Sequence, residues 1–286
     1  FLAKMSNNQI PAWFSNPWLA WGVGPVMAAN LGYWLTGLFL EWYIHRPSVV
    51  RKLVTWKGGS GDRMIDINKT RSKVPFRNEQ LFGPKGGFAT LAGPAACFGG
   101  ILSTLIFKRM IGMDFGVVSS ITWDTILRQL IIMEVIGDFG LYWGHRVQHE
   151  VPYLYLNFHS YHHRIDTPTP LGAACIDKVD ATLQVTLPVF LAVAVVRPHP
   201  LIFYIYLFMR VAQNVMNHSG LEDSPLDWLF LRFECLGRAQ ACHHDAHHKF
   251  GSRAGNSVNL GENFWVWDVM FGTYSPRSQM RHTKDA

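Results

Sequence analysis

The chain has 286 residues, of which 49% are hydrophobic, 14% aromatic and only 16% charged, and its formal net charge is +6. A soluble domain usually carries about 25% charged residues, so this chain is poor in charge. The high hydrophobic content excludes a disordered chain and a coiled coil, and four cysteines in a chain of this length exclude a small disulfide-stabilised scaffold. The four cysteines form no Cys-x-x-Cys pair, which excludes a thiolate metal cage. A large soluble core and a membrane protein remain, and the placement of the charges distinguishes them.

Two apolar stretches in the first 120 residues are long enough to cross a bilayer, which needs about 20 residues. The first, Pro17 to Ile44, contains 28 residues, one charge (Glu41) and aromatic side chains at both ends, as membrane–water interfaces favour. The second, Phe88 to Phe107, has 20 uncharged residues rich in Gly, Ala and Ser, which allow close helix contact in lipid. Both predict membrane helices; for the first, a buried helix of a soluble protein is the alternative.

Basic residues gather between these two stretches. Ten of the 26 Lys and Arg lie between Arg46 and Lys85, beside only three acidic residues. Such a run next to an apolar span is more typical of a cytoplasmic membrane loop than of a nucleic-acid-binding patch, so we expect no nucleic-acid partner. We therefore predict one domain of membrane helices and basic loop over residues 1–120, and a second over residues 121–286.

Three further apolar stretches follow in the second half. Thr125 to Trp143 is interrupted by three charged residues. Ala181 to Val196 and Leu201 to Val215 would each extend only about 24 Å as a helix, short of a hydrocarbon core of about 30 Å. They form either a re-entrant hairpin or a spanning pair extended by flanking residues. The prediction is an all-α integral membrane bundle of four to five apolar helices, with a histidine-rich metal region on the cytoplasmic side by the positive-inside rule.

Histidines mark the second half as the chemical part of the chain. Eleven of the 13 lie within residues 145–248, where an even spread would put fewer than five. Residues three or four apart share a helix face, and imidazole binds Fe, Zn, Cu and Ni. One such ion takes four to six ligands, so ten histidines at these spacings predict a dinuclear site. The predicted ligands are His145, His149, His159, His162, His163, His218, His243, His244, His247 and His248.

Carboxylates lie near the first pair. At about 100° per residue, Glu134, Asp138, His145 and His149 fall within an arc of about 60°. Asp138 could then accept an N–H bond from a metal-bound imidazole and fix its tautomer. A pairing of Glu134 and Asp138 with Arg128, or with water in a polar cavity, is the alternative. Asp245 is a third candidate for such a supporting role.

The histidine segments resemble, in order and spacing, the boxes of the fatty acid hydroxylase / sterol desaturase superfamily. The resemblance covers about residues 125–276, while the first 120 residues match only in being hydrophobic. Asp138 precedes the first box as the family's acidic residue does. The matching segments are His145-Arg-Val-Gln-His149, His159-Ser-Tyr-His-His163, Asn217-His-Ser-Gly220, His243-His-Asp-Ala-His-His248 and Trp267-Asp-Val-Met-Phe-Gly-Thr273.

This resemblance implies a helical membrane protein whose cytosol-facing di-iron centre uses O2 to hydroxylate, demethylate or desaturate a membrane lipid, a sterol or a fatty acyl chain. It implies metal ligation by the box histidines, most directly by His244, His247 and His248 in the last box, with Zn as the alternative ion in purified protein. The third and last boxes are nearest to C4-methylsterol oxidases. No haem segment of the cytochrome b5 type is present, so an external donor such as cytochrome b5 and its reductase is expected, in the endoplasmic reticulum or another organelle membrane.

Two other functions remain open at this point. One is a membrane subunit that keeps the metal site but has a structural role in a larger complex. The other is a histidine-rich metal transporter, whose ligands should line a path across the bilayer instead of gathering at one face.

Overall fold

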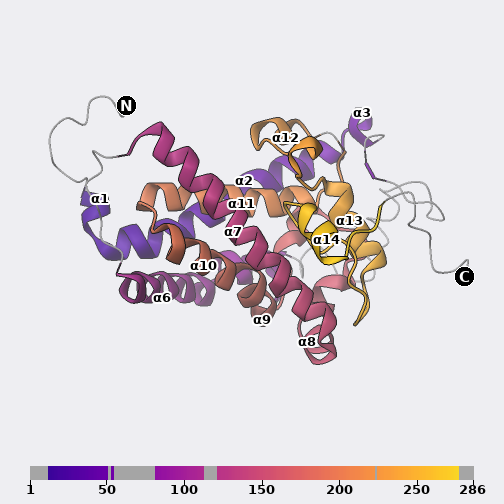
Figure 1. The fold of residues 1–286 in the computed structure, drawn as a ribbon, viewed down its shortest axis with the longest axis horizontal. Helices are drawn as coiled ribbons and strands as arrows, with labels where there is room; N and C mark the ends of the chain where they lie inside the picture. The colour runs from indigo at the N-terminus through magenta and orange to yellow at the C-terminus, as the bar shows by residue number, and fades with distance from the viewer. Residues whose placement is uncertain (1–11, 51–52, 55–80, 113–120, 223, 277–286) are drawn as a thin grey trace, which may run out of the picture.

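The computed structural model describes residues 12–50, 53–54, 81–112, 121–222 and 224–276. These residues are mostly helical, with no strand and only two isolated bridges, Leu53 to Leu221 and Arg238 to Phe264. The predicted all-α fold is confirmed. In Figure 1 the helices α8 (Pro152–Asn157), α13 (Ala241–Phe250) and α14 (Val266–Phe271) lie toward one end of the bundle, and α1 (Ala12–Ser15) and α6 (Pro94–Ile111) toward the other.

The two N-terminal apolar stretches fold as expected, with one interruption. The first forms a π-helical turn, η2 (Leu19–Val23), that continues into α2 (Gly24–Ile44). The second is divided into η3 (Phe88–Ala92) and α6. The break falls at Gly93, whose ψ of 153° is extended, because the residue before a proline is disfavoured in the helical region and Pro94 follows.

The apolar stretches of the second half extend beyond their predicted ends. Helix α7 spans Trp123–Glu150, with the Thr122 hydroxyl accepting a bond from the Thr125 amide at its start. Elements α9 (Lys178–Ala181), η7 (Thr182–Thr186) and α10 (Leu187–Val196) follow one another without a gap, and α11 spans Pro200–Asn217. The flanking residues thus lengthen both short stretches.

Three segments of the described chain are long and apolar enough to cross a membrane: Leu19–Ile44, Pro94–Ile111 and Lys178–Val196. Helices α7 and α11 have comparable length, but charged and amide side chains interrupt their apolar character. The predicted bundle of apolar helices is therefore present, with two of its members carrying polar groups into the interior.

The long helices pack in two pairs, α2 along α11 and α10 along α7. In the first pair, Tyr33 and Leu40 of α2 share a buried cluster with Ala212 and Val215 of α11. A second cluster, around Trp21, joins η2 to residues of α7, α10 and α11. Residues distant in sequence thus share two buried cores that hold the long helices together.

The outer faces of the helices are apolar and exposed. On α7, Leu127, Ile131, Val135 and Phe139 recur every four residues and are 37–64% exposed. Phe98 of α6 is 69% exposed. Large contiguous apolar surface of this kind is rare on soluble proteins and matches the lipid-facing side of membrane helices. The chain is a membrane protein.

Short elements complete the described chain. The predicted basic loop between Arg46 and Lys85 lies mostly outside the described residues, as does the predicted domain boundary near residue 120. Helix α12 (Pro225–Leu229) starts with a capping box in which the Ser224 and Asp227 side chains bond each other's backbone amides. The short elements are α3 (Pro47–Val50), η5 (His159–Arg164), η6 (Pro170–Ala174), α12 (Pro225–Leu229) and η8 (Glu234–Leu236).

Candidate metal centre

Four separated segments bring nine histidines together. The last turns of α7 carry two, the 3-10 turn η5 carries three, one follows the end of α11, and α13 carries three. Each of them is at least 94% buried. They fall into a five-histidine group, His145, His149, His159, His163 and His247, and a four-histidine group, His162, His218, His244 and His248.

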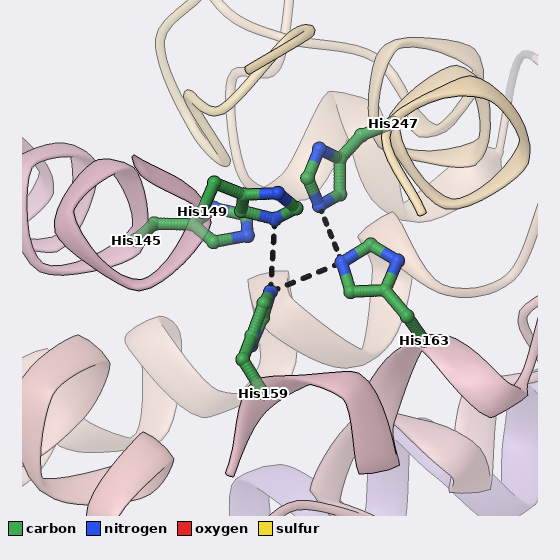
Figure 2. Close-up of side chains that lie close together, drawn as sticks. All are labelled: His145, His149, His159, His163 and His247. Carbon is green, nitrogen blue, oxygen red and sulfur yellow. Dashed lines mark hydrogen bonds between the residues drawn. The ribbon is translucent and has the colours of Figure 1, made fainter. Parts of the chain in front are cut away.

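The five-histidine group is drawn in Figure 2, with its rings converging on one region. The Nε2 atom of His159 lies 3.0 Å from Nε2 of His149 and 3.0 Å from Nε2 of His163. The His163 and His247 Nε2 atoms are also 3.0 Å apart. One ligand atom from each ring lies within 4.8 Å of the others, so a single ion could contact all five.

The four-histidine group repeats this arrangement. Its Nε2 atoms follow one another at 3.2 Å from His162 to His218, 3.1 Å from His218 to His244 and 3.1 Å from His244 to His248. His244 and His248 are four apart on α13, and His162 and His218 approach from η5 and the end of α11. Every ring therefore presents the same nitrogen to the centre of its group.

Oxygen acceptors behind the rings fix the tautomers. A carbonyl oxygen can only accept, so the Nδ1 atom that contacts it carries the proton and leaves Nε2 with a bare lone pair. His162 and His218 are held in this way, by the Cys175 carbonyl at 3.3 Å and the Asn214 carbonyl at 2.7 Å. His248 is held by the Ile165 carbonyl at 2.9 Å. Two lone pairs facing each other at 3.2 Å, as in His162 and His218, need a cation between them to be stable.

Backbone carbonyls also orient two rings of the five-histidine group. Nδ1 of His145 donates to the Leu260 carbonyl at 2.9 Å, and Nδ1 of His247 donates to the Val258 carbonyl at 2.8 Å. The His145 Nε2 atom is buried and has no hydrogen-bond partner in the described chain. An orphaned buried acceptor aimed at a cluster of other imidazole nitrogens is accounted for by a metal ion.

Burial disfavours the protonated form of eight of the nine rings, because it lowers their pKa. It lowers the pKa of His163, His244, His247 and His248 well below the usual histidine value, and the neighbouring rings lower it further. Burial lowers the pKa of His218 to about 3. A metal ion must compete with protons for an imidazole, so rings that are neutral at pH 7 are ready to bind it.

The nitrogen spacing also fits an ion. Two nitrogens at right angles around an ion with metal–nitrogen bonds of about 2.1 Å lie about 3.0 Å apart. The six Nε2 separations are 3.0–3.2 Å. The donor set, all imidazole, suits Fe, Zn, Cu or Ni and does not suit Mg or Ca.

His243 does not join either group, contrary to the sequence prediction. Its Nε2 atom donates to the Asp268 carboxylate at 2.9 Å. The physical reason is the turn of α13: His244, His247 and His248 share one face at spacings of three and four, and His243 lies outside it, about 90° from the middle of that face. The pair His243 and His247 has a ligand-like spacing, but only His247 points to the centre.

Two of the carboxylates predicted to support the histidines, Asp138 and Glu134, have other partners. Asp138 accepts four bonds, from the Arg210 guanidinium, the Trp267 indole and the amides of Asn263 and Phe264, at 3.0–3.1 Å. It bonds no imidazole among the described residues, which corrects the sequence prediction. It lies seven residues before His145 on α7, about 10 Å along the axis, so its place on the same face does not bring it within reach.

Glu134 pairs with Arg238 at 3.1 Å and accepts a bond from the Asn263 amide at 3.1 Å. Arg128, the alternative partner considered for it, contacts Asp124 instead, at 3.7 Å. Asp245 is buried within α13 at 2% exposure, and its supporting role stays a prediction.

Asp180 has the role that the sequence assigned to Asp138. Its Oδ2 atom accepts from Nδ1 of His159 at 2.9 Å, and its Oδ1 atom accepts from Gln184 at 2.5 Å. Asp180 is fully buried in α9. Sequence reasoning missed it because its 21-residue separation from His159 follows no helical spacing. The only signal was an acid directly before an apolar stretch, with a second acid, Asp177, three residues earlier.

The segment around Trp267 and Thr273 supports the centre from outside. The Asp268 carboxylate accepts bonds from the amides of Leu260 and Gly261, at 2.6 and 2.9 Å, and from the Thr273 hydroxyl at 2.7 Å. These bonds hold the loop whose carbonyls orient His145 and His247. The sequence segment Trp-Asp-x-x-Phe-Gly-Thr is thus a brace for ligand orientation.

A cavity opens on the four-histidine group. His162 and His218 line it, together with apolar residues such as Leu141 and Val185. A neighbouring groove between α2, α6, α10 and α11 shares Thr90, Leu91 and Val185 with this cavity. Apolar space therefore extends from the membrane helices to the histidines.

The fold and this histidine arrangement are those of a membrane protein with a candidate dinuclear site. Residues 130–273, half of the chain, match the family model of the fatty acid hydroxylases. The chain belongs to the fatty acid hydroxylase family.

Individual relatives carry different activities in their names. The chain is 28% identical over 164 residues to methylsterol monooxygenase 2-2 of Arabidopsis thaliana, covering 57% of this chain and 59% of that protein. It is 29% identical over 155 residues to sphinganine C4-monooxygenase 1 of the same plant, with 54% and 56% covered. It is 26% identical over 201 residues to a very-long-chain aldehyde decarbonylase of Oryza sativa subsp. japonica, with 67% and 74% covered. No solved structure matches this chain.

Proposed function

We propose that this protein is an O2-dependent membrane lipid oxygenase whose two histidine groups each hold one iron ion at the cytosolic face of the membrane. The observation that carries the proposal is the inward direction of bare Nε2 lone pairs in both groups, at spacings that fit metal ligation. Iron is favoured over zinc because oxidising a C–H bond requires a redox-active metal. When bound, two such ions would supply the electron exchange with O2 that lipid oxidation needs.

The two histidine groups have different positions relative to the cavity and therefore different roles. The five-histidine group offers more ligands and contributes no described residue to the cavity lining, so its histidines would hold an ion away from substrate. The four-histidine group has two of its members, His162 and His218, in the cavity wall, so these histidines would hold an ion beside the substrate. Apolar residues around the cavity exclude water and accept a lipid chain that enters from the membrane groove.

The names of the relatives support a lipid substrate. Two are monooxygenases of a methylsterol and of sphinganine, and a third is an aldehyde decarbonylase. A sterol or fatty acyl substrate, an electron donor such as cytochrome b5 with its reductase, and residence in the endoplasmic reticulum complete the proposal.

The test is metal analysis joined to turnover. We expect the purified protein to hold two iron ions per chain and to oxidise lipid in membranes that supply a reductase chain. His162→Ala and His247→Ala should each lose one ion and all turnover. His199→Ala, which removes a helix-capping side chain outside both groups, should lose neither.

Full activity of His162→Ala would refute the assignment of the ligands. Stoichiometric purification with a larger complex, with ions bound but no turnover of any lipid, would instead identify the structural subunit. Lipid profiling of cells that lack the protein identifies the substrate.

A further inference from the structure

One face of α11 lines the cavity over two helical turns. Arg210, Asn214 and His218 lie four residues apart, so their side chains share this face, and all three line the cavity. His218 belongs to the four-histidine group. Arg210 and Asn214 place polar groups in the cavity wall two turns and one turn before this candidate metal ligand, and Asp180 and Gln184 line the same cavity.

Arg210 has a hydrogen-bond donor with no partner. The side chain is 5% exposed, and its Nη1 atom donates to Asp138 at 3.0 Å. Its Nη2 atom is buried and has no partner in the described chain. A buried guanidinium donor left unpaired is costly, so each such case in a folded protein needs a ligand or a water to account for it. Since Arg210 lines the cavity, that partner can come from the cavity.

Glu262 supplies an acceptor on the same side. It is 4% exposed, it lines the cavity, and it accepts a bond from the Asn214 amide at 2.9 Å. A carboxylate has about four acceptor positions, so this bond leaves capacity for a further donor. Glu262 is close enough to Arg210 for its charge to stabilise the guanidinium.

The charges decide what kind of group fits. Asp138 already balances Arg210, and Glu262 adds a second negative charge, so the patch has no spare positive charge for a carboxylate or a phosphate. A neutral group that both accepts and donates is complementary to one free N–H and one carboxylate. A hydroxyl group meets this requirement, while an ether or an ester oxygen can only accept.

We propose that Arg210 and Glu262 bind the hydroxyl group of a long-chain lipid alcohol, with Arg210 donating to its oxygen and Glu262 accepting its proton. The apolar chain then lies along the cavity and the groove beside α6. As a statement about the substrate, this rests on the proposed oxygenase function. Arg210 and Asn214 are one to two turns from His218, about 6–12 Å along the helix, so the attacked carbon is separated from this hydroxyl by several bonds.

The experiment compares three probes that share one chain: 1-octadecanol, methyl octadecyl ether and octadecane. Each is supplied at the same mole fraction to the full-length protein in lipid nanodiscs, and mass spectrometry counts the probe retained per chain. We expect the wild-type protein to retain the alcohol at least tenfold better than the alkane and several-fold better than the ether. This readout requires neither turnover nor bound metal.

Two variants and one control identify the residues. Arg210→Lys keeps a positive charge beside Asp138 but removes the second donor, so the preference for alcohol over alkane should fall below about threefold. Glu262→Gln keeps an acceptor for Asn214 but weakens the bond to a hydroxyl proton, so the preference for alcohol over ether should fall most. Arg238→Lys alters a buried guanidinium paired with Glu134 outside this cavity, and should retain probes as the wild type does.

Equal retention of all three probes by the wild-type protein would overturn the inference, and so would equal retention of alcohol and ether. A full alcohol preference in both variants would do the same. The proposed oxygenase function is judged separately, by iron content and turnover, and can stand if the hydroxyl preference fails.

Discussion

Replacing Asp180 with asparagine measures how much a buried carboxylate contributes to metal binding through a ligand it touches. In the protein, the carboxylate accepts from Nδ1 of His159 at 2.9 Å, and Nε2 of the same ring points to the centre of the five-histidine group. An asparagine can still accept this bond through its carbonyl oxygen. It carries no charge, so it makes His159 a weaker electron donor to a cation.

The expected magnitude follows from this single contact. Loss of one such supporting partner typically weakens metal binding 10–100-fold, which is about 1.4–2.7 kcal/mol. One of five rings is affected in the five-histidine group. Within the described chain, Asp180 bonds no ring of the four-histidine group, so that group should lose much less. We therefore expect two binding steps in Asp180→Asn, one weakened 10–100-fold and one near the wild-type value.

The assay is titration of metal-free, detergent-solubilised protein with Fe(II) under anaerobic conditions, against a chelator of known affinity. Asp177→Asn is the matched control, because Asp177 caps the same helix α9 by accepting from the Val179 amide and asparagine caps equally well. Unchanged affinity in Asp180→Asn would refute the reasoning. Equal weakening of both steps would also refute it, since the effect would then be a general loss of structure.

Three further predictions concern neighbouring features. His243→Ala should keep two ions per chain in metal analysis, because His243 lies outside both groups; loss of an ion would contradict its exclusion. Gly144→Ala should lower the free energy of unfolding by about 1–3 kcal/mol in thermal unfolding, because a Cβ there would lie 2.2 Å from the Leu183 carbonyl oxygen. The control Gly99→Ala, with open space around it, should be neutral or stabilising. Equal melting temperatures of the two variants would contradict this close packing. Metal-free protein should melt at progressively lower temperature as pH falls below about 6.5. Below that pH the unfolded chain binds protons on its histidines, whereas buried folded rings such as His218, with a pKa of about 3, do not, so protonation favours the unfolded state. A melting temperature that is flat between pH 7.5 and 5 would contradict the buried, neutral state of the rings.

The histidine spacing predicted most of the centre because the relevant segments are helical. His145 and His149 end α7, and His244 and His248 lie on α13, so a spacing of four residues places each pair on one face. The last box contains two overlapping pairs with this spacing. Sequence alone does not say which of these four rings points away from the centre, so the prediction of His243 as a ligand is wrong.

The supporting contacts were less predictable because they depend on distances between elements. The angular position of Asp138 on α7 was correct, but angle alone ignores the rise of about 10 Å to His145. Asp180 and the carbonyls of Val258 and Leu260 reach the rings through tertiary packing and loop conformation, which no periodic pattern encodes. Similarly, the break at Gly93 came from a local backbone restriction within a stretch that is uniformly apolar.

The dependence of His145 and His247 on the loop held by Asp268 has a consequence for biosynthesis. The last box histidine is His248, yet the carbonyls that aim these two rings come 10–12 residues later, and their brace comes later still. When the ribosome has just completed α13, all nine histidines of the two groups have been synthesised, but the carbonyls that orient His145 and His247 have not. A chain truncated by a nonsense mutation after Phe250 would thus contain all the box histidines but lack the carbonyls that orient His145 and His247.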